Sequence, residues 1–348
     1  MEAWGIAIPT LHAESLRRRL AGSHQLRRDL LPIREGKRVI FPVLDKSATA
    51  LPLGSEVVRR AFPERPQPRP DRYQDLVTIP DPLRPSLPRS FDVVGDVVLI
   101  RLPSELEPFR REIGQALLAF VPGARIVAQD SGVHGDARIR TLYPLAGEGG
   151  FSTVHRENGI SFHVDLERAY FSPRLAGEHA RIARAARDGE TFLDLFCGVG
   201  PFSLTALARH KDLRAIAVDS NAGALEMLRR SAHALGVEDR IDVVCEDARA
   251  FLAHPGTFSR VVMNLPHEGY KYVGLVAPHV VGGGAIHYYE VTPRELRSER
   301  ARILLDQIGK SPGVGSWSVQ EERLVHPYSP GADLVVYTLV RAPRPTGE

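Results

Sequence analysis

The chain has 348 residues, of which 43% are hydrophobic and 25% are charged. This length and composition predict two or three folded domains and exclude bulk disorder, because about 100–200 residues make one domain. No apolar run approaches about 18 residues, and two cysteines, Cys197 and Cys245, cannot build a disulfide framework or a structural zinc site. The N-terminus lacks the zones of a secretory signal, so we expect a cytosolic, monomeric protein with no membrane anchor and no metal.

The net charge of +3 is too small to indicate a nucleic-acid partner, but the basic residues are unevenly distributed. Residues 1–65 carry 12 Lys and Arg against 7 Asp and Glu, a local charge of +5. The other 283 residues carry 33 basic and 35 acidic side chains, a charge of −2. This basic N-terminal region could contact phosphates, and on charge alone it could equally be a solvated surface.

The N-terminal region, residues 1–65, has the pattern of a small α+β domain. Its hydrophobic spacing predicts a strand at 4–8, a helix at 13–21 and a strand at 38–43. The chain is then dense in proline over residues 62–90. Because proline lacks a backbone donor and disfavours helix in the preceding residue, we expect an extended linker, placed at 66–88.

Residues 89–168 have the pattern of a second small α+β domain. The sequence FDVVGDVVLIRL predicts a strand at 91–102, and Ser104 with Glu107 predicts a capping box that opens a helix. The apolar face of this helix consists of Phe109, Ile113, Leu117 and Phe120. Further strands are expected at 124–128, 138–143, 151–155 and 160–164.

From residue 169 to the end, strands alternate with helices. The expected strands are 191–196, 214–218, 240–245, 260–263, 285–290, 316–322 and 334–341. The expected helices are 176–187, one that begins at residue 201, 222–235, a turn after 245, and 293–308. Helices between consecutive strands predict a parallel, doubly wound α/β sheet. The last two strands lack a helix between them and should pair antiparallel.

A glycine turn follows the first strand of this sheet. The apolar strand ends in Asp194, and the chain turns on Gly198 and Gly200 before a helix begins at Pro201. Glycines here let the backbone approach a ligand at a helix N-terminus and at the carboxyl end of a strand. A dinucleotide fingerprint needs a third glycine where this chain has Ser203, which disfavours a pyrophosphate ligand. A purely structural strand–turn–helix joint remains the alternative.

The next three strands also end in polar residues. Asp219 could accept hydrogen bonds from both ribose hydroxyls, because Asn221 is available to cap the following helix. Asp247 could receive an adenine amino group, or it could be a surface carboxylate. Asn264 and Pro266, in the sequence Asn-Leu-Pro, could present an amide and a carbonyl to a planar base.

These four strand ends resemble those of class I S-adenosylmethionine-dependent methyltransferases. The segment YFSPRLAGE at 170–178 narrows the resemblance to the archaeal–eukaryotic tRNA (guanine-37-N1)-methyltransferase family. Three other segments are similar to the same family, PRSFDVVGD at 88–96, GDAR at 135–138 and HRENG at 155–159. The resemblance implies a Rossmann-like methyltransferase domain at 169–348, with an antiparallel last strand, preceded by two small α+β domains.

The resemblance implies methyl transfer from S-adenosylmethionine to N1 of guanosine 37, next to the tRNA anticodon. Guanine N1 carries a proton at neutral pH, so the site needs a base for that proton and a donor for the charge that develops on O6. By family position, Glu178 is the base and Arg138 the donor, with Arg140 as the second choice. Asn264, which the resemblance places in the catalytic set, and Pro266 should hold the guanine edge. Without the resemblance, Glu178 would equally be an acid that favours the helix dipole.

The resemblance also implies the set of residues that contact the cofactor. Tyr170 should lie near the methionine end of S-adenosylmethionine. The full set is Tyr170, Arg174, Asp194, Phe196, Gly198, Gly200, Asp219, Asp247 and Asn264. Cys197 replaces the alanine common in the family and is expected to be a packing residue, with an oxidisable thiol as the alternative. We expect His267 to be an exposed turn residue rather than a catalytic one.

The resemblance further implies that the N-terminal domain contacts the outer corner of tRNA, for which a charge of +5 is suitable. Two related activities remain open. One is aminocarboxypropyl transfer to a wyosine-type base, which the Asn-Leu-Pro sequence with Glu178 and Arg138 disfavours. The other is a dual enzyme that also methylates carbon 7 of the tricyclic wyosine precursor. Ser203 disfavours a nicotinamide-dependent dehydrogenase, and the intact set of acids disfavours an inactive tRNA-binding module.

Overall fold

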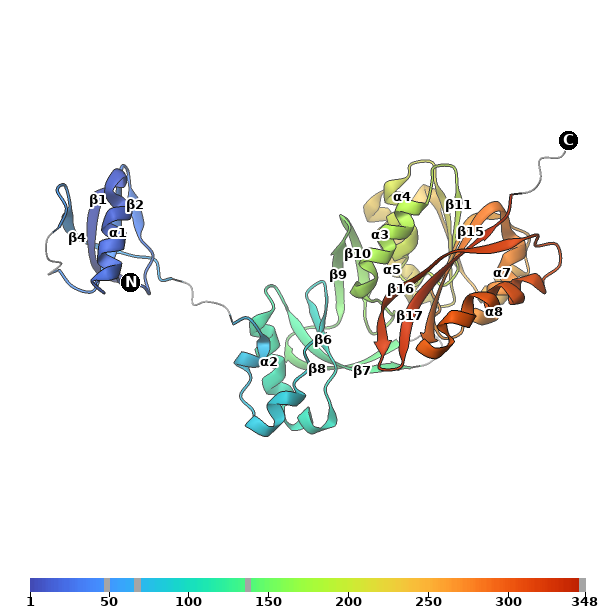
Figure 1. Ribbon diagram of the computed structural model, residues 1–348, viewed down its shortest axis with the longest axis horizontal. Coiled ribbons are helices and arrows are strands. Elements are labelled where there is room, and N and C mark those ends of the chain that lie inside the picture. Colours follow the sequence, from blue (N-terminus) through green and yellow to red (C-terminus); the bar gives the residue numbers. More distant parts are fainter. Residues whose placement is uncertain (47–50, 66–69, 135–138, 344–348) are drawn as a thin grey trace. The chain divides into compact units, whose positions relative to one another are not determined.

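The structure is a computed structural model that describes residues 1–46, 51–65, 70–134 and 139–343. Contacts between residues divide the chain into two compact units, Met1–Asp71 and Arg72–Glu348 (Figure 1). Each unit has its own hydrophobic core, and among the described residues no core cluster contains members of both units. No helix in the described part of the chain is long and apolar enough to cross a membrane.

The described part of the first unit is a four-stranded antiparallel sheet with one α-helix, which a short 3-10 helix at Thr10–His12 precedes. Its elements are β1 (Glu2–Pro9), α1 (Ala13–Gly22), β2 (Ile33–Glu35), β3 (Arg38–Val43) and β4 (Glu56–Ala61), in the strand order β2-β3-β1-β4. The predicted helix and two strands are present. The sequence did not predict β2 and β4, because β2 has three residues and β4 is mostly exposed and contains two arginines.

The proline-dense segment differs from the expected extended linker. Short 3-10 helices form at Tyr73–Leu76 and Asp81–Ser86, and Tyr73 is 1% exposed. The Tyr73 hydroxyl donates a hydrogen bond to the carbonyl of Pro88 at 2.7 Å. Apolar side chains between the prolines pack into the core beneath α2 (Arg110–Phe120), so the linker expectation does not hold over residues 73–88.

The second unit begins with a four-stranded sheet and a separate hairpin. The sheet has the order β5-β6-β7-β8, from Asp92–Val94, Val97–Ile100, Ile126–His134 and Ile139–Gly147, and the hairpin is β9 (Ser152–Glu157) with β10 (Ile160–Asp165). The strand expected at 91–102 is broken into β5 and β6 because Gly95 turns the chain at a φ of +58°. The predicted capping box is wrong: Ser104–Phe109 is a 3-10 helix without a side-chain cap, and the Glu107 carboxylate accepts from the Gln129 amide instead.

The rest of this unit is a seven-stranded sheet in the order β13-β12-β11-β14-β15-β17-β16. The strands are β11 (Thr191–Asp194), β12 (Arg214–Asp219), β13 (Ile241–Cys245), β14 (Phe258–Met263), β15 (Val280–Pro293), β16 (Trp317–Ser329) and β17 (Ala332–Arg341). β17 pairs antiparallel with both of its neighbours, whereas the other pairs are parallel. This confirms the predicted doubly wound sheet with an antiparallel last strand.

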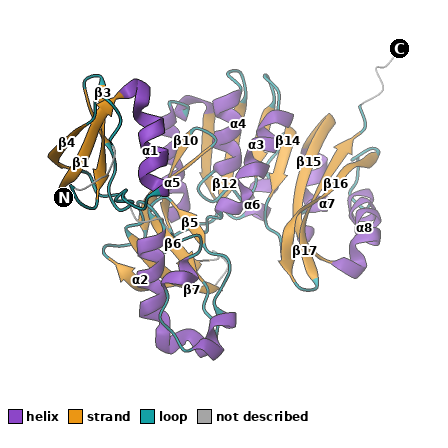
Figure 2. Cartoon of the chain, turned by 60° about the vertical axis from the view of Figure 1, so that its left-hand side comes forward, coloured by secondary structure: helices purple, strands orange, loops and turns teal. Residues whose placement is uncertain are grey.

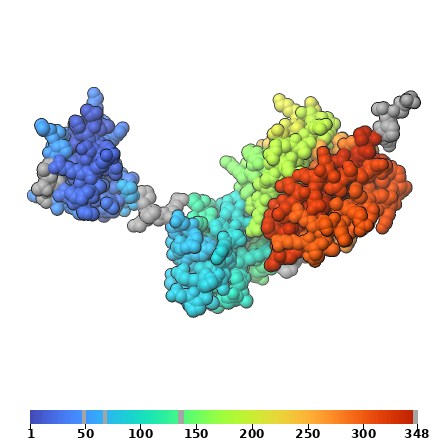
Figure 3. All heavy atoms as spheres, in the orientation of Figure 1, coloured from blue at the N-terminus to red at the C-terminus, as the bar shows by residue number. Residues whose placement is uncertain are grey.

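Helices cover both faces of this sheet (Figure 2). One face carries α3 (Ala176–Ala185), α4 (Pro201–Arg209) and α5 (Ala222–Leu235), and the other carries α6 (Ala248–Leu252), α7 (Val273–Val276) and α8 (Arg297–Gly309). Neighbouring strand residues alternate between the two cores: Phe192 packs with the first group and Leu193 with the second. Residues of β5 to β8 and β10 also contribute side chains to the first core, whereas the residues around α2 form a core of their own. Figure 3 shows the two parts of the unit packed together.

The connections place a crevice at the centre of the sheet. The chain leaves β11 toward β12 on one side, and β14 lies on the other side of β11. Ligands of open α/β sheets bind at this switch in strand order, beyond the carboxyl ends of the strands.

Candidate active site

A cavity of about 560 Å³ lies at the carboxyl ends of the four adjacent strands β13, β12, β11 and β14. This volume is within the range of about 300–1,000 Å³ that is typical of small-molecule sites. The lining residues come from six segments, within 170–179, 195–202, 219–224, 246–248, 264–272 and 326–334. The cavity therefore lies where the strand-end residues of the sequence were expected to meet.

The glycine loop forms one wall of the cavity. Gly198 and Gly200 have φ values of +54° and +76°, which side chains disfavour. A Cβ on Gly198 would have its nearest neighbour, the Tyr170 carbonyl, 3.8 Å away, so the space beside this residue is open. A Cβ on Gly200 would lie 2.6 Å from Leu228, so this glycine is required for packing and does not line the cavity.

Asp219 lines the cavity at the end of β12. Its carboxylate accepts hydrogen bonds from the backbone N–H groups of Gly198, at 2.8 Å, and Asn221, at 2.9 Å. Burial raises the pKa of Asp219, and these backbone hydrogen bonds oppose the shift. Asn221 caps α5 through its side chain, as expected, which leaves Asp219 at the cavity.

The other two strand-end acids differ from each other. Asp247 lines the cavity and also caps α6, because its side chain accepts from the N–H groups of Arg249 and Ala250. Asp194 is fully buried beneath the glycine loop, does not line the cavity, and accepts a hydrogen bond from the Ser203 hydroxyl at 2.8 Å. Burial raises the pKa of Asp194 to about 7, with Asp219 adding to the shift and Ser203 opposing it.

Asn264 and Pro266 follow β14 and line the cavity beside the glycine loop. The Oδ1 atom of Asn264 is buried and has no hydrogen-bond partner among the described residues. An unpaired buried acceptor is costly, so this atom is suited to receive an N–H group of a ligand.

Glu178 lies in the first turn of α3 but not among the residues that line the cavity. Its carboxylate is buried and accepts hydrogen bonds from the Tyr289 hydroxyl at 2.9 Å and from Arg181 Nε at 3.1 Å. It also forms an ion pair with Arg323 of β16. Phe202, which does line the cavity, packs on the ring of Tyr289, so this cluster lies directly behind the cavity wall.

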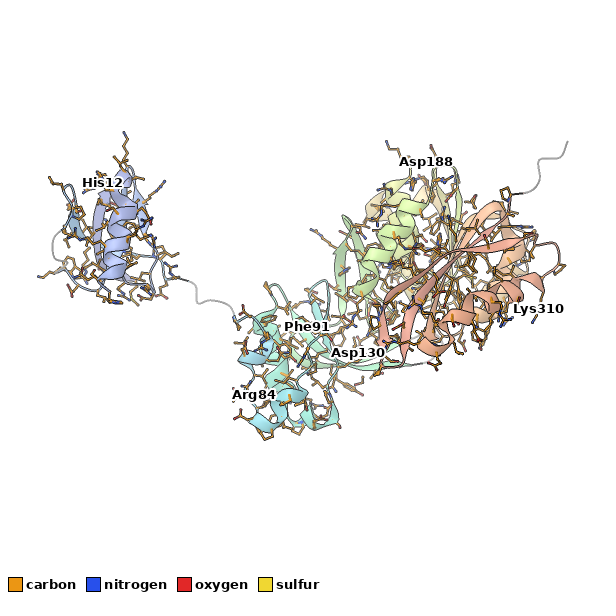
Figure 4. The ribbon with its side chains drawn as sticks, in the orientation of Figure 1. His12, Arg84, Phe91, Asp130, Asp188 and Lys310 are labelled. Carbon is orange, nitrogen blue, oxygen red and sulfur yellow. The ribbon has the colours of Figure 1, made fainter. Side chains whose placement is uncertain are left out.

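Arg138 lies outside the described residues. The second choice, Arg140, is buried and forms an ion pair with Asp130, whose position on β7 Figure 4 marks. One guanidinium nitrogen of Arg140 donates to the Phe171 carbonyl at 3.1 Å, and its carbon lies 4.8 Å from the centre of the Tyr170 ring. Arg140 therefore supports Tyr170 and Phe171, which line the cavity, from behind.

The cavity contains six of the nine residues expected to contact the cofactor. They are Tyr170, Phe196, Gly198, Asp219, Asp247 and Asn264. Asp194 and Gly200 support the loop from below, and Arg174 forms an exposed ion pair with Asp92 at 2.7 Å. Cys197 lines the cavity, and burial raises its pKa well above the ordinary value, so the thiol stays protonated and unreactive.

Sequence reasoning missed a buried pair on the other side of α3. His179 lines the cavity, and its Nδ1 lies 2.6 Å from a carboxylate oxygen of Glu157 in β9. Burial alone would raise the pKa of Glu157, but hydrogen bonds with His155 and His179 outweigh it and hold the pKa at about 2. The motif HRENG contained Glu157, but nothing in the sequence indicated that it would meet His179.

Two aromatic contacts at the mouth of the cavity were also missed. Tyr272 lines the cavity, and the guanidinium of Arg249 lies 5.0 Å from the centre of its ring. Tyr328, at the end of β16, also lines the cavity, and its hydroxyl lies 3.2 Å from His267 Nε2. His267 is exposed, as expected. Tyr328 is 61 residues away in sequence, and only the order of strands in the sheet brings it to this place.

The cavity fits an adenosyl cofactor. The open space at Gly198 and the carboxylate of Asp219 offer a close backbone approach and an acceptor for hydroxyls. Among the described residues, no group of three or more His, Cys, Asp or Glu side chains is arranged to hold a metal ion.

Comparison with known proteins agrees with this fold. Residues 153–315 match the TRM5/TYW2 methyltransferase domain, and residues 76–150 match the TYW2 N-terminal domain. The tRNA (guanine(37)-N(1))-methyltransferase Trm5b of Pyrococcus abyssi is 33% identical over 331 residues, which cover 93% of this chain and 95% of that protein. The tRNA(Phe) (4-demethylwyosine(37)-C(7)) aminocarboxypropyltransferase of Pyrococcus horikoshii is 29% identical and covers 75% of this chain and 92% of its own length.

A solved structure described as the complex of aTrm5 and tRNALeu matches this chain with a TM-score of 0.78 and 29% identity. The match covers 97% of this chain and 99% of the chain in that structure. The doubly wound sheet, the glycine loop and the strand-end residues define an α/β transferase of the class I methyltransferase type. The chain belongs to the TRM5/TYW2 methyltransferase family, whose members are S-adenosylmethionine-dependent transferases that act on tRNA.

Proposed function

We propose that this protein transfers the methyl group of S-adenosylmethionine to N1 of guanosine 37 in tRNA. The observation that carries the proposal is the convergence of Asn264, Pro266, Tyr170 and Gly198 on one cavity, with a buried amide oxygen left unpaired at Asn264. A guanine edge presents N–H donors to such an oxygen. The match to the Pyrococcus abyssi enzyme over 93% of this chain supports the same substrate.

The length of the matches favours methyl transfer over aminocarboxypropyl transfer. The match to the aminocarboxypropyltransferase includes 92% of that protein but leaves a quarter of this chain unmatched. The first unit, Met1–Asp71, accounts for about that share. The methyltransferase of Pyrococcus abyssi matches nearly the whole of both chains.

The chemistry divides between the cofactor and the residues of this chain. S-adenosylmethionine supplies an electrophilic methyl group on its sulfonium. Asp219 and Asp247 would hold the adenosyl part, the glycine loop would let it approach the backbone, and Asn264 would orient the guanine. Arg138, by resemblance, would stabilise negative charge on O6 as N1 loses its proton.

We keep Glu178 as the proposed acceptor of the N1 proton. Leu175, directly before α3, and His179, next to Glu178 in α3, line the cavity, so the Glu178 carboxylate lies one layer behind the wall. The side chain of its partner Arg323 is 36% exposed, but its Nε and Nη2 atoms are buried, so the Arg323 side chain must move before an RNA phosphate can compete with the carboxylate for Nη2. Catalytic hydrogen bonds commonly become aligned only in the substrate complex.

The first unit is proposed to contact tRNA phosphates. Ion pairs with carboxylates hold Arg17, Arg18, Arg27, Arg38, Arg59 and Arg60. Within the described residues, Arg19, Arg28, Arg34 and Lys37 have no carboxylate partner and are exposed. These four cations are available for a polyanion.

Two forms of labelled cofactor test the proposal. Unmodified tRNA transcripts are incubated with S-adenosylmethionine labelled either in the methyl group or in the carboxyl carbon, and the nucleosides are identified after digestion. Methyl label in 1-methylguanosine, and no carboxyl label, is the expected result. Carboxyl label in the RNA would identify an aminocarboxypropyltransferase. A transcript with adenosine at position 37 is the control and should remain unlabelled.

A further inference from the structure

The mouth of the cavity carries a group of rings that the proposed reaction does not use. His326 and Tyr328 from the end of β16 line the cavity, and His267 from the loop after β14 contacts Tyr328. The rings of His267 and Tyr328 are 5.5 Å apart at an interplanar angle of 69°. We call His267, His326 and Tyr328 the aromatic rim.

Irregularities in β16 bring two of these side chains to the cavity. β16 is the last strand of the sheet, and its pairing with β17 shifts between Leu324 and His326 and again between Pro327 and Ser329. Such bulges re-aim side chains and occur frequently beside active sites. His326 and Tyr328 both line the cavity as a result, together with Leu334 of β17.

The Tyr328 ring is held in place and remains accessible. The contact with His267, at 3.2 Å between the hydroxyl and Nε2, restrains its orientation. Tyr328 nevertheless keeps 50% of its surface exposed. A restrained and accessible aromatic ring at the entrance of a cavity is how proteins that bind single-stranded RNA receive an unstacked base.

We propose that the aromatic rim is a stacking platform for an anticodon-loop nucleobase, with Tyr328 as the ring that contacts it. The inference rests on the proposed function for the identity of the RNA. A base in the loop must leave its neighbours to reach Asn264, and Tyr328 would replace the stacking that it loses. Tyr328 is then a binding residue for RNA and contributes nothing to the affinity for the cofactor.

Steady-state kinetics of the full-length protein test the platform. Tyr328→Ala should raise KM for tRNA by roughly 5- to 150-fold, the range for loss of one base–aromatic stack, and leave kcat within about threefold. The dissociation constant for S-adenosylhomocysteine should be unchanged. Tyr328→Phe keeps the ring but loses the hydroxyl contact with His267, so its KM for tRNA should lie between those of wild type and Tyr328→Ala. Leu324→Ala, at an exposed position on the same strand outside the cavity, is the control for strand integrity and should behave as wild type.

Equal kinetics of wild type and Tyr328→Ala would overturn the platform, and so would a parallel loss of cofactor affinity. Anticodon stem-loops with an abasic site at position 36 or 38 identify the stacked base. If Tyr328→Ala still raises KM with both abasic stem-loops, the base that stacks on Tyr328 is the target guanine. If the increase in KM disappears with one of them, the base missing from that stem-loop is the one that stacks on Tyr328. If the wild type modifies no tRNA, the proposed function fails. The platform is then judged by tRNA binding alone, in which Tyr328→Ala must bind more weakly than wild type.

Discussion

At the scale of single residues, the contacts of Glu178 with Arg181 and Arg323 bear on whether Glu178 can act as the base. The Glu178 carboxylate accepts a hydrogen bond from Arg181, forms an ion pair with Arg323 and lies behind the cavity wall. To take a proton from guanine N1 it must exchange at least one of these partners for the substrate. Its role as a base can therefore be tested separately from its role in the buried cluster.

Glu178→Gln should lower the single-turnover rate of methyl transfer by roughly 100- to 10,000-fold, because the amide cannot accept the proton. The dissociation constant for S-adenosylhomocysteine should not change, since Glu178 does not line the cavity. Rapid quench with labelled cofactor gives the rate, and calorimetry gives the affinity.

Glu321→Gln is the matched control for Glu178→Gln. Glu321 accepts from Arg181 at 2.8 Å and lies 3.5 Å from Arg323, so it shares both arginines with Glu178. If the two variants slow the reaction equally, the arginine cluster and not the base explains the loss. If Glu178→Gln instead loses most of its affinity for the cofactor, Glu178 is not the base.

Asp194 gives a prediction about pH. Burial raises its pKa to about 7, above the ordinary value near 3.8. Between these two values the folded protein holds a proton that the unfolded chain has released, so this residue makes the protein less stable as the pH rises through that window. The Asn side chain in Asp194→Asn is neutral at every pH, so this variant lacks the contribution of Asp194 to the pH dependence of stability.

The melting temperature of Asp194→Asn relative to wild type should therefore increase from pH 5 to pH 8, by at least about 2 °C. Thermal unfolding followed by circular dichroism at the two pH values measures it. Asp242→Asn, an exposed position on β13, should show no such trend. A constant difference between Asp194→Asn and wild type would mean that Asp194 does not take up a proton in this range.

At the scale of elements, the loop between β11 and α4 contains Gly198 and Gly200, in which a side chain would have different effects. Both have positive φ, so alanine at either position costs on the order of 1–2 kcal/mol in the backbone. Gly200→Ala adds a clash with Leu228, which is fully buried, whereas Gly198→Ala projects into open space beside the cavity.

Gly200→Ala should therefore lower the melting temperature more than Gly198→Ala does. Gly198→Ala should instead weaken S-adenosylhomocysteine binding, roughly tenfold or more, because its methyl group occupies space for the ligand. Differential scanning fluorimetry and calorimetric titration of both variants measure these effects. Equal effects on stability and on affinity would show that the loop responds as one unit.

Hydrophobic periodicity predicted most elements of the second unit. The helix expected at 222–235 forms at Ala222–Leu235, and the strand expected at 214–218 forms at Arg214–Asp219. The predictions failed where tertiary contacts override local pattern. Ser104 and Glu107 have the spacing of a capping box, but Glu107 finds Gln129 across the fold, and the prolines near Tyr73 support short helices rather than an extended chain.

The residues of the site were predictable to the extent that they end strands. Asp219, Asp247 and Asn264 follow consecutive strands, and parallel pairing brings them to one edge. The same logic placed Asp194 in the cavity, although the side chain at this strand end is buried beneath the loop. Tyr328 could not be predicted, because its place depends on strand order and on a bulge that has no local signature. His179 could not be predicted, because its partner Glu157 lies on a hairpin strand 22 residues earlier in the chain.

At the scale of the whole molecule, the separate cores of the two units indicate that they fold independently. The first unit buries Ile6, Ile8, Leu16, Leu20 and Phe41 around its own helix, and none of these belongs to the cores of the second unit. The whole cavity, including Asn264 and Tyr328, belongs to Arg72–Glu348. A chain that begins at residue 72 should therefore fold and bind the cofactor as the full protein does.

Removal of residues 1–71 should lower kcat/KM for full-length tRNA by at least about tenfold and leave kcat/KM for an anticodon stem-loop unchanged. The first unit forms no part of the cavity, and under the proposed function it would bind phosphates outside the anticodon arm. The full-length triple variant Arg28→Ala, Arg34→Ala, Lys37→Ala keeps the unit and removes three exposed cations. Its tRNA affinity should depend less steeply on salt, by about 0.7–0.9 in log–log slope for each phosphate that the variant no longer neutralises. Equal reductions on both RNA substrates would instead assign the first unit to the stability of the catalytic unit.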